Sequence, residues 1–306
     1  MNNSILVQMS EDLLIPVNQL QLLSITAPHR YKVYQIKKRN GRGERTIAQP
    51  AKVVKRLQYW VIEHILKQCP IHNCATAYQE GSSIRKNASA HKDCSFILKM
   101  DFQNFFPSLT PNDFIAHLKL HGIPNDYTEE DINLLCRILF WKPRRGNGLI
   151  LSIGAPSSPA VSNTLLFSFD EKMSTFCDQN HICYTRYADD LTFSMNNRDL
   201  RTPLLDYLCN VLHELPFPRL YINREKTFFG SKSACRKVTG LVLTNDGRVS
   251  LGREKKRLIR SMIDHYLKGH LNGDEAKQLR GLLAFAKDVE PSFVERMNEH
   301  YGAISF

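Results

Sequence analysis

Two adjacent aspartates, Asp189 and Asp190, stand at the tip of a pattern that predicts a β-hairpin. Apolar and polar residues alternate on both sides of the pair, from Ile182 to Ser194, as in two strands joined by a tight turn. Neighbouring carboxylates repel each other, and their pKa values rise unless a cation neutralises them. Mg²⁺ prefers carboxylate oxygens, so the pair is a candidate metal site. A solvated surface turn is the plainer alternative.

A third carboxylate follows another predicted strand, far upstream. The β-branched and aromatic run 95–100 ends in Asp101. A strand that ends in one aspartate and a hairpin that carries two can bring three carboxylates from distant parts of the chain to one place. Such a cluster is the protein half of a two-metal phosphoryl-transfer site, in which two ions about 3.5–4 Å apart hold the attacking and leaving oxygens.

Together these motifs resemble the palm of a reverse transcriptase. The resemblance rests on DFQNFFPS at 101–108 and on YADD at 187–190. It implies that Asp101, Asp189 and Asp190 bind two Mg²⁺ ions, with the carbonyl of Phe102 as a further ligand. The activity implied is RNA-templated DNA synthesis from deoxynucleoside triphosphates.

The resemblance also implies contacts to the incoming nucleotide. Arg45, in the segment RTIAQP, would contact the triphosphate, and Gly154, Ala155 and Pro156 would approach the nucleotide closely because they are small. The family usually has a glutamine where this chain has Ile153, which removes a polar contact to the nucleotide but leaves the metal chemistry.

Two further residues are expected in the catalytic centre. Phe106 would lie under the sugar and exclude a ribose 2′-hydroxyl; one more phenylalanine of the palm core is the alternative. Lys226, in the segment YINREKT, resembles the family's lysine beside the pyrophosphate leaving group and would be a general acid. An exposed lysine in a turn is the alternative for that residue.

Two short motifs resemble those of bacterial retron reverse transcriptases, within the group-II-intron-like superfamily. Asn87 and His91 belong to an Asn-Ala-x-x-His sequence, and Val238, Thr239 and Gly240 form a Val-Thr-Gly sequence. The resemblance implies that both motifs contact RNA or primer. A helix would place Asn87 and His91 on one face, where structural hydrogen bonding is the alternative.

Positive charge favours a polyanionic partner. The chain has 41 Lys and Arg against 30 Asp and Glu, a net charge of +11. Ten Lys or Arg between residues 30 and 56 face one acid, Glu44; a solvated face is the alternative there. Family resemblance implies that a C-terminal thumb clasps the duplex and recognises the cognate RNA, whereas charge alone indicates phosphate contacts. The basic run of this region is Arg253, Lys255, Lys256, Arg257 and Arg260.

Composition argues against a membrane-spanning, a secreted or a zinc-binding protein. No apolar run approaches the roughly 18 residues of a membrane span, and no basic residue precedes Arg30 as in a secretory signal. The eight cysteines lack zinc-site spacing, which favours reduced thiols in a cytoplasm. The retron resemblance implies that this cytoplasm is bacterial.

With 306 residues, the chain is long enough for two or three subdomains. We expect an α+β fold, the right-hand polymerase, with a small antiparallel palm sheet packed on helices and a helical thumb. Its parts would be fingers at 1–94, a palm at 95–240 with a helical fingers insertion at about 110–155, and a thumb at 241–306. Apolar spacing predicts helices at 10–27, 50–67, 111–120, 128–140, 159–176, 200–215, 253–268, 273–288 and 290–301, and a hairpin of 31–36 and 44–49 with its turn at 40–43.

The expected function is that of a retron polymerase. Its template would be a dedicated structured non-coding RNA, its primer a 2′-hydroxyl of that RNA, and its product a branched RNA–DNA (msDNA). Anti-phage defence with an effector protein encoded nearby is also implied. One alternative is another defence or intron-type reverse transcriptase with a different template or a protein primer. The other is an RNA-binding scaffold with a vestigial site, which Ile153 favours and the three aspartates oppose.

Overall fold

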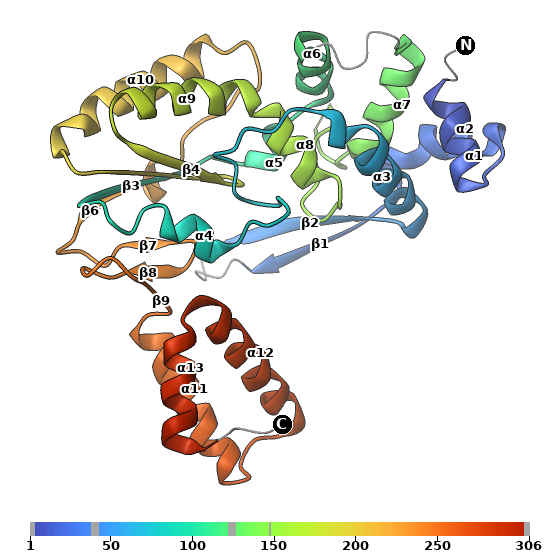
Figure 1. Cartoon of the computed structure of the whole chain (residues 1–306). Coiled ribbons are helices and arrows are strands. Elements are labelled where there is room, and N and C mark those ends of the chain that lie inside the picture. Colours follow the sequence, from blue (N-terminus) through green and yellow to red (C-terminus); the bar gives the residue numbers. More distant parts are fainter. Residues whose placement is uncertain (1–3, 38–42, 122–126, 147, 303–306) are drawn as a thin grey trace.

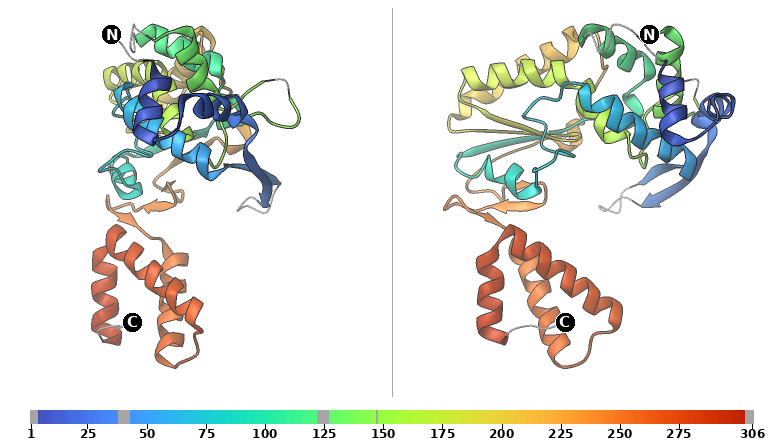
Figure 2. Two further views of the ribbon diagram at one scale, coloured as in Figure 1. Left: turned by 90° about the vertical axis from the view of Figure 1, so that its right-hand side faces the viewer. Right: turned by 45° about the vertical axis from the view of Figure 1, so that its right-hand side comes forward.

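The computed structural model of the chain describes residues 4–37, 43–121, 127–146 and 148–302. Helices and two small sheets form an upper body, and three helices form a separate lower lobe joined to it by a third small sheet (Figures 1 and 2). Within the described ranges, no helix is both long enough and apolar enough to cross a bilayer.

The central sheet of the upper body carries the two aspartate motifs. It has four antiparallel strands in the order β4-β5-β3-β6, so the hairpin β4–β5 lies beside β3. Alternation turns Leu191 and Phe193 toward the helices α9 and α10, which cover one face of the sheet (Figure 1). The elements are β3 (Phe96–Asp101), β4 (Cys183–Tyr187), β5 (Asp190–Met195), β6 (Phe228–Ser231), α9 (Phe167–Gln179) and α10 (Arg201–Glu214).

The predicted basic hairpin is present as β1 (Tyr31–Lys37) and β2 (Glu44–Pro50), paired from Tyr31↔Pro50 to Lys37↔Glu44. Most of its expected turn lies outside the described residues. The remaining helices of the upper body are α1 (Ile5–Leu13), α2 (Val17–Thr26), α3 (Lys52–His64), α4 (Ile84–Ser89), α5 (Phe105–Ser108), α6 (Pro111–His121), α7 (Glu129–Leu139) and α8 (Ser158–Leu165).

Two helices expected to be continuous are each divided. The segment 10–27 breaks between α1 and α2, where Leu14 has a φ of +53° and Pro16 cannot continue a helix. The segment 159–176 breaks at Leu166, between α8 and α9. No glycine or proline marks that second break, so apolar spacing alone does not locate it.

A second hydrophobic core runs through the lower lobe and reaches Ala88 and Ile97 of the upper body. That core includes Val238, Leu241, Ile259, Leu279 and Phe293, so it extends into the small sheet above the helices. The expected boundary between residues 240 and 241 falls in the turn that joins two strands of this sheet. The elements are β7 (Lys237–Val238), β8 (Leu241–Leu243), β9 (Val249–Ser250), α11 (Arg253–Leu267), α12 (Gly273–Val289) and α13 (Pro291–Tyr301).

Candidate active site

The sheet brings the three predicted carboxylate residues to one of its ends. Asp101, the last residue of β3, pairs in register with Asp190, the first residue of β5. Tyr187 pairs with Asp190 across the hairpin, which leaves Ala188 and Asp189 as a two-residue turn. Residues that are far apart in the sequence are therefore neighbours at the tip of the hairpin β4–β5, as the motifs predicted.

Burial and neighbouring negative charge make ionisation of Asp189 and Asp190 unfavourable. Burial, and then the charge of Asp101, raise the pKa of Asp189. Burial also raises the pKa of Asp190 to about 6; Lys99 opposes the shift, while Asp189 and Asp101 add to it. Such a cluster favours binding of a cation, because a cation relieves the repulsion.

Asp101 already holds a cationic side chain. The Nζ of Lys226, at the end of a short 3₁₀ helix (Arg224–Lys226), is 2.8 Å from both carboxylate oxygens of Asp101. Half of the Lys226 side chain is exposed, so it can move away from the aspartate. Among the described residues, no group of three or more His, Cys, Asp or Glu side chains is arranged to hold a metal ion by itself. The donor chemistry nevertheless fits Mg²⁺, whose protein ligands are a few carboxylate oxygens, completed by phosphate and water.

A cavity of about 400 Å³ contains the predicted nucleotide-binding residues Phe106 and Gly154 to Pro156. Gly154 has a φ of +125°, and a Cβ there would lie 3.1 Å from Ile47 Cγ2 and 3.2 Å from the Ala48 carbonyl oxygen. The Ala48 N–H also donates to the Ile153 carbonyl at 2.9 Å. Close approach between β2 and this loop therefore requires glycine.

Lys55, Tyr59 and Tyr78 line the same cavity. The sequence indicated Lys55 only as one member of the basic run 30–56, and it did not single out the two tyrosines. Burial raises the pKa of Tyr78, the charges of Tyr187 and Asp189 add to the shift, and Arg45 opposes it. Tyr78 therefore lies between the cavity and Asp189. The predicted triphosphate ligand Arg45 is close enough to lower the pKa values of both Tyr78 and Asp189. The apolar stripe of α3 indicated only a core helix, which concealed Lys55 and Tyr59 on its other face.

The expected contact of Asn87 and His91 with RNA is wrong for these side chains, because both are buried. The helix α4 ends at Ser89, so His91 lies beyond it rather than on a shared face. His91 Nδ1 is 2.8 Å from Ser194 Oγ, and its Nε2 is 2.7 Å from Thr185 Oγ1. His91 therefore makes structural hydrogen bonds to one face of the hairpin β4–β5, and Asn87 accepts a hydrogen bond from the Thr76 hydroxyl.

We expect His91→Gln to reduce the loss of stability in acid. Burial lowers the pKa of His91 to about 3, whereas an unfolded histidine titrates near 6.5. The stability it contributes is thus complete above pH 6.5 and is lost as the pH falls toward 3, by about 2 kcal/mol at pH 5. Denaturant unfolding at pH 7.5 and pH 5 would measure the difference. His117, whose pKa burial lowers to about 4, keeps its share of the pH dependence in the variant. Equal pH dependence in both proteins would contradict the prediction.

The Val-Thr-Gly motif is divided between core and surface. Val238 is fully buried in the core of the lower lobe, so its side chain does not reach RNA, contrary to the expectation. Thr239 and Gly240 form the turn between β7 and β8, with φ values of +46° and +81°. Within this motif, the turn of Thr239 and Gly240 remains a candidate for contact with RNA or primer.

The basic run of α11 likewise has two kinds of residue. Arg253, Arg257 and Arg260 are exposed, and Lys255 lies over the ring of Phe285. Lys256 is instead 20% exposed, and its Nζ is 2.6 Å from Glu290 Oε1. Burial works to raise the pKa of Glu290, but hydrogen bonds from Lys256, Leu251 and Ser250 hold it below its ordinary value. Lys256 is therefore a structural residue rather than the expected RNA contact.

Replacing Arg253 and Arg257 together by alanine should weaken RNA binding and flatten its salt dependence. Each lost phosphate contact lowers the slope of log K against log salt by about 0.7–0.9, so the pair should lower it by about 1.5. Lys256→Ala is the matched control: it should keep the slope and lower the melting temperature, because Glu290 loses its nearest cationic partner. Equal slopes in the double variant and the wild type would exclude phosphate contacts at these arginines.

A four-stranded antiparallel sheet with carboxylates at one end, a basic hairpin beside it and a separate helical lobe together define a right-hand nucleic-acid polymerase. Residues 36–243 match the family of reverse transcriptases (RNA-dependent DNA polymerases). The chain belongs to the bacterial retron reverse transcriptases, as the following similarities establish, and it is an RNA-directed DNA polymerase.

Two relatives from Escherichia coli are similar along almost their whole length. The retron Ec83 reverse transcriptase is 43% identical, over 92% of this chain and 89% of the relative. The retron Ec86 reverse transcriptase is 33% identical, over 99% of this chain and 91% of the relative. Among solved structures, telomerase from Candida albicans with a fragment of telomeric RNA gives a TM-score of 0.48 at 13% identity, over 91% of this chain and 59% of that one.

Proposed function

We propose that the protein synthesises the DNA of a retron by copying a dedicated structured non-coding RNA, starting from a 2′-hydroxyl of that RNA. The product is then a branched RNA–DNA, msDNA. The convergence of Asp101, Asp189 and Asp190 at one end of the sheet carries the catalytic part of this proposal. Membership of the retron family supports the choice of template, primer and product.

In this proposal Asp101 and Asp189 hold two Mg²⁺ ions, Asp190 completes the charge cluster, and the Phe102 carbonyl is an additional ligand. When bound, the ions lower the pKa of the priming hydroxyl and stabilise the charge of the triphosphate and of the departing pyrophosphate. Lys226 then leaves Asp101 and supplies a proton to the pyrophosphate. Its partial exposure and its present contact with Asp101 support this role.

The deoxynucleoside triphosphate occupies the cavity lined by Phe106, Gly154, Ala155 and Pro156, with Arg45 on its phosphates. Ile153 replaces a polar side chain there and leaves binding to the remaining contacts. We place the enzyme in the bacterial cytoplasm, where its RNA–DNA product and an effector protein encoded nearby act in anti-phage defence.

The test is to express the chain with its upstream genomic flank and to extract nucleic acid from the purified protein. The extract is treated with RNase and with DNase, beside the control variant Asp189→Asn, Asp190→Asn. We expect a discrete DNA of fixed length that is covalently attached to RNA and absent from the control. RNA without DNA in both samples would instead indicate an RNA-binding scaffold, and no bound nucleic acid would contradict the dedicated template.

A further inference from the structure

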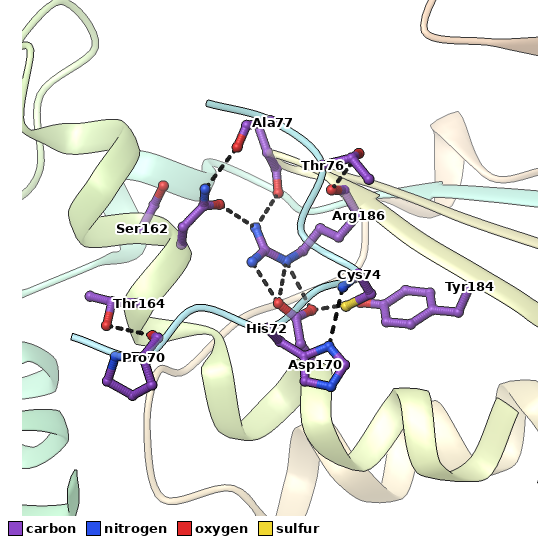
Figure 3. A network of polar contacts seen from close by, with 12 residues as sticks. Pro70, His72, Cys74, Thr76, Ala77, Ser162, Thr164, Asp170, Tyr184 and Arg186 are labelled. Atoms are coloured by element: carbon purple, nitrogen blue, oxygen red, sulfur yellow. Dashed lines mark hydrogen bonds and ion pairs between the residues drawn. The ribbon is translucent and has the colours of Figure 1, made fainter. Parts of the chain in front are cut away.

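A fully buried ion pair, between Arg186 and Asp170, lies next to the turn formed by Ala188 and Asp189 (Figure 3 shows the pair). Arg186, in β4, and Asp170, in α9, are both withdrawn from solvent. Arg186 Nε lies 2.9 and 3.0 Å from the two carboxylate oxygens of Asp170, and Nη2 lies 2.6 Å from one of them. The hydroxyl of Tyr184 donates to the same carboxylate at 2.8 Å. A buried pair is weak evidence of stabilisation, because desolvation can outweigh the attraction, so another use deserves consideration.

The remaining nitrogen of Arg186 reaches the turn itself. Nη1 donates to the Ala188 carbonyl oxygen at 3.1 Å and to Asn163 Oδ1 at 3.0 Å. Ala188 has a φ of +57°, which a residue other than glycine adopts only when its surroundings impose it. The guanidinium, fixed by Asp170, therefore stabilises an unfavourable backbone conformation directly before Asp189.

Both peptide groups that flank the Cα of Asp189 are consequently held. The preceding peptide carries the Ala188 carbonyl, which Arg186 binds. The following peptide carries the Asp189 carbonyl, which accepts the Phe102 N–H at 3.1 Å. Two fixed peptide planes determine the direction of the Cα–Cβ bond between them. The direction in which the Asp189 side chain leaves the backbone is thus set by groups that do not touch its oxygens.

The same guanidinium is connected to the nucleotide cavity. Asn163 belongs to α8, which begins directly after the cavity loop, at Ser158. Its Nδ2 donates to the Ala77 carbonyl at 2.8 Å, and Ala77 adjoins Tyr78 of the cavity wall. Asn163 therefore fixes the wall and the guanidinium relative to each other.

We propose that Arg186 is a positioning residue for catalysis: supported by Asp170 and Asn163, it aims the Asp189 carboxylate and keeps it in register with the nucleotide cavity. The inference rests on the polymerase activity and on metal binding by Asp189. It differs from a purely structural ion pair in one respect, because it requires the contact to Ala188 and not only a buried charge.

The test compares two variants with wild type. Arg186→Lys keeps the charge beside Asp170 but cannot also reach Ala188. The second variant combines Arg186→Met, Asp170→Leu and Tyr184→Phe, replacing the buried polar groups with apolar ones, a change that often preserves stability. We expect kcat on an RNA template with a DNA primer to fall about 100-fold in both, since small misplacement of a reacting group costs that much. KM for deoxynucleotides should stay within about threefold. Mn²⁺ binding, followed by electron paramagnetic resonance without nucleotide, should weaken.

Tyr184→Phe alone is the matched control, because it removes a hydrogen bond to Asp170 and leaves the turn untouched. It should retain wild-type kcat and Mn²⁺ affinity. The inference would be overturned if either test variant folded and had the kcat and the Mn²⁺ affinity of the wild type. Failure of both to fold would overturn it too, because the pair would then be a requirement of folding alone. Inactive wild-type enzyme would count against the proposed function instead, which separates the two failures.

Discussion

Asp101→Asn should reduce DNA synthesis about 1,000-fold, equivalent to about 4 kcal/mol of transition-state stabilisation, without unfolding the protein. Asp101 faces Asp190 in the sheet and binds Lys226, so the amide removes one charge of the proposed metal site and the partner of the proposed general acid. The fold should tolerate the change, because it relieves repulsion within the carboxylate cluster. Primer extension at saturating Mg²⁺ measures the rate, and thermal unfolding measures the stability.

Asp113→Asn is a suitable control for this experiment. Asp113 is also a buried aspartate, but it accepts hydrogen bonds from Thr110 at the start of α6. Its amide should lower the melting temperature and leave the polymerase rate unchanged. If Asp101→Asn kept more than about a tenth of the wild-type rate, Asp101 could not be a metal ligand that the reaction requires.

The hairpin β4–β5 could be predicted from the sequence because its signals are local. Alternation fixes which residues of β4 and β5 face α9, and the polar pair fixes the turn. The neighbouring strand was harder to place, since its pairing with β5 joins distant segments; the family motif, rather than periodicity, joined Asp101 to the pair. Gly154 likewise stood in a recognisable motif, and the contact with β2 now explains why it is glycine.

The side-chain roles that the sequence did not indicate depend on contacts with residues that are distant in the chain. Lys256 and Arg257 are adjacent basic residues of α11. Of the two, Lys256 forms the ion pair with Glu290, which lies between α12 and α13. A histidine such as His91 can bind RNA, but both of its ring nitrogens are hydrogen-bonded to hydroxyls on the two strands of the hairpin. Arg186 offered a usable signal: it alternates with Tyr184 on the inward face of its strand, where a charge requires a buried partner.

Phe106→Ala should admit ribonucleotides, with a drop of about 100-fold in the preference for deoxynucleotides. Phe106 lines the cavity together with the loop 154–156, and it lies on α5, five residues after Asp101. A ring in this position excludes a 2′-hydroxyl by contact, so a methyl group would leave room for it. The ratio of kcat/KM for a deoxynucleotide to that for the matching ribonucleotide, measured on one template, gives the selectivity.

Phe105→Leu distinguishes this role from packing. The Phe105 ring centroid is 5.3 Å from that of Phe106, but Phe105 is 3% exposed and belongs to the core, where it stacks on Phe102. Its replacement should lower the melting temperature and leave sugar selectivity as in the wild type. Unchanged selectivity in Phe106→Ala, together with a comparable loss of stability, would instead make Phe106 one more core phenylalanine. The choice of sugar would then have to come from other residues of the cavity, such as Tyr78, whose pKa the charge of Asp189 helps to raise.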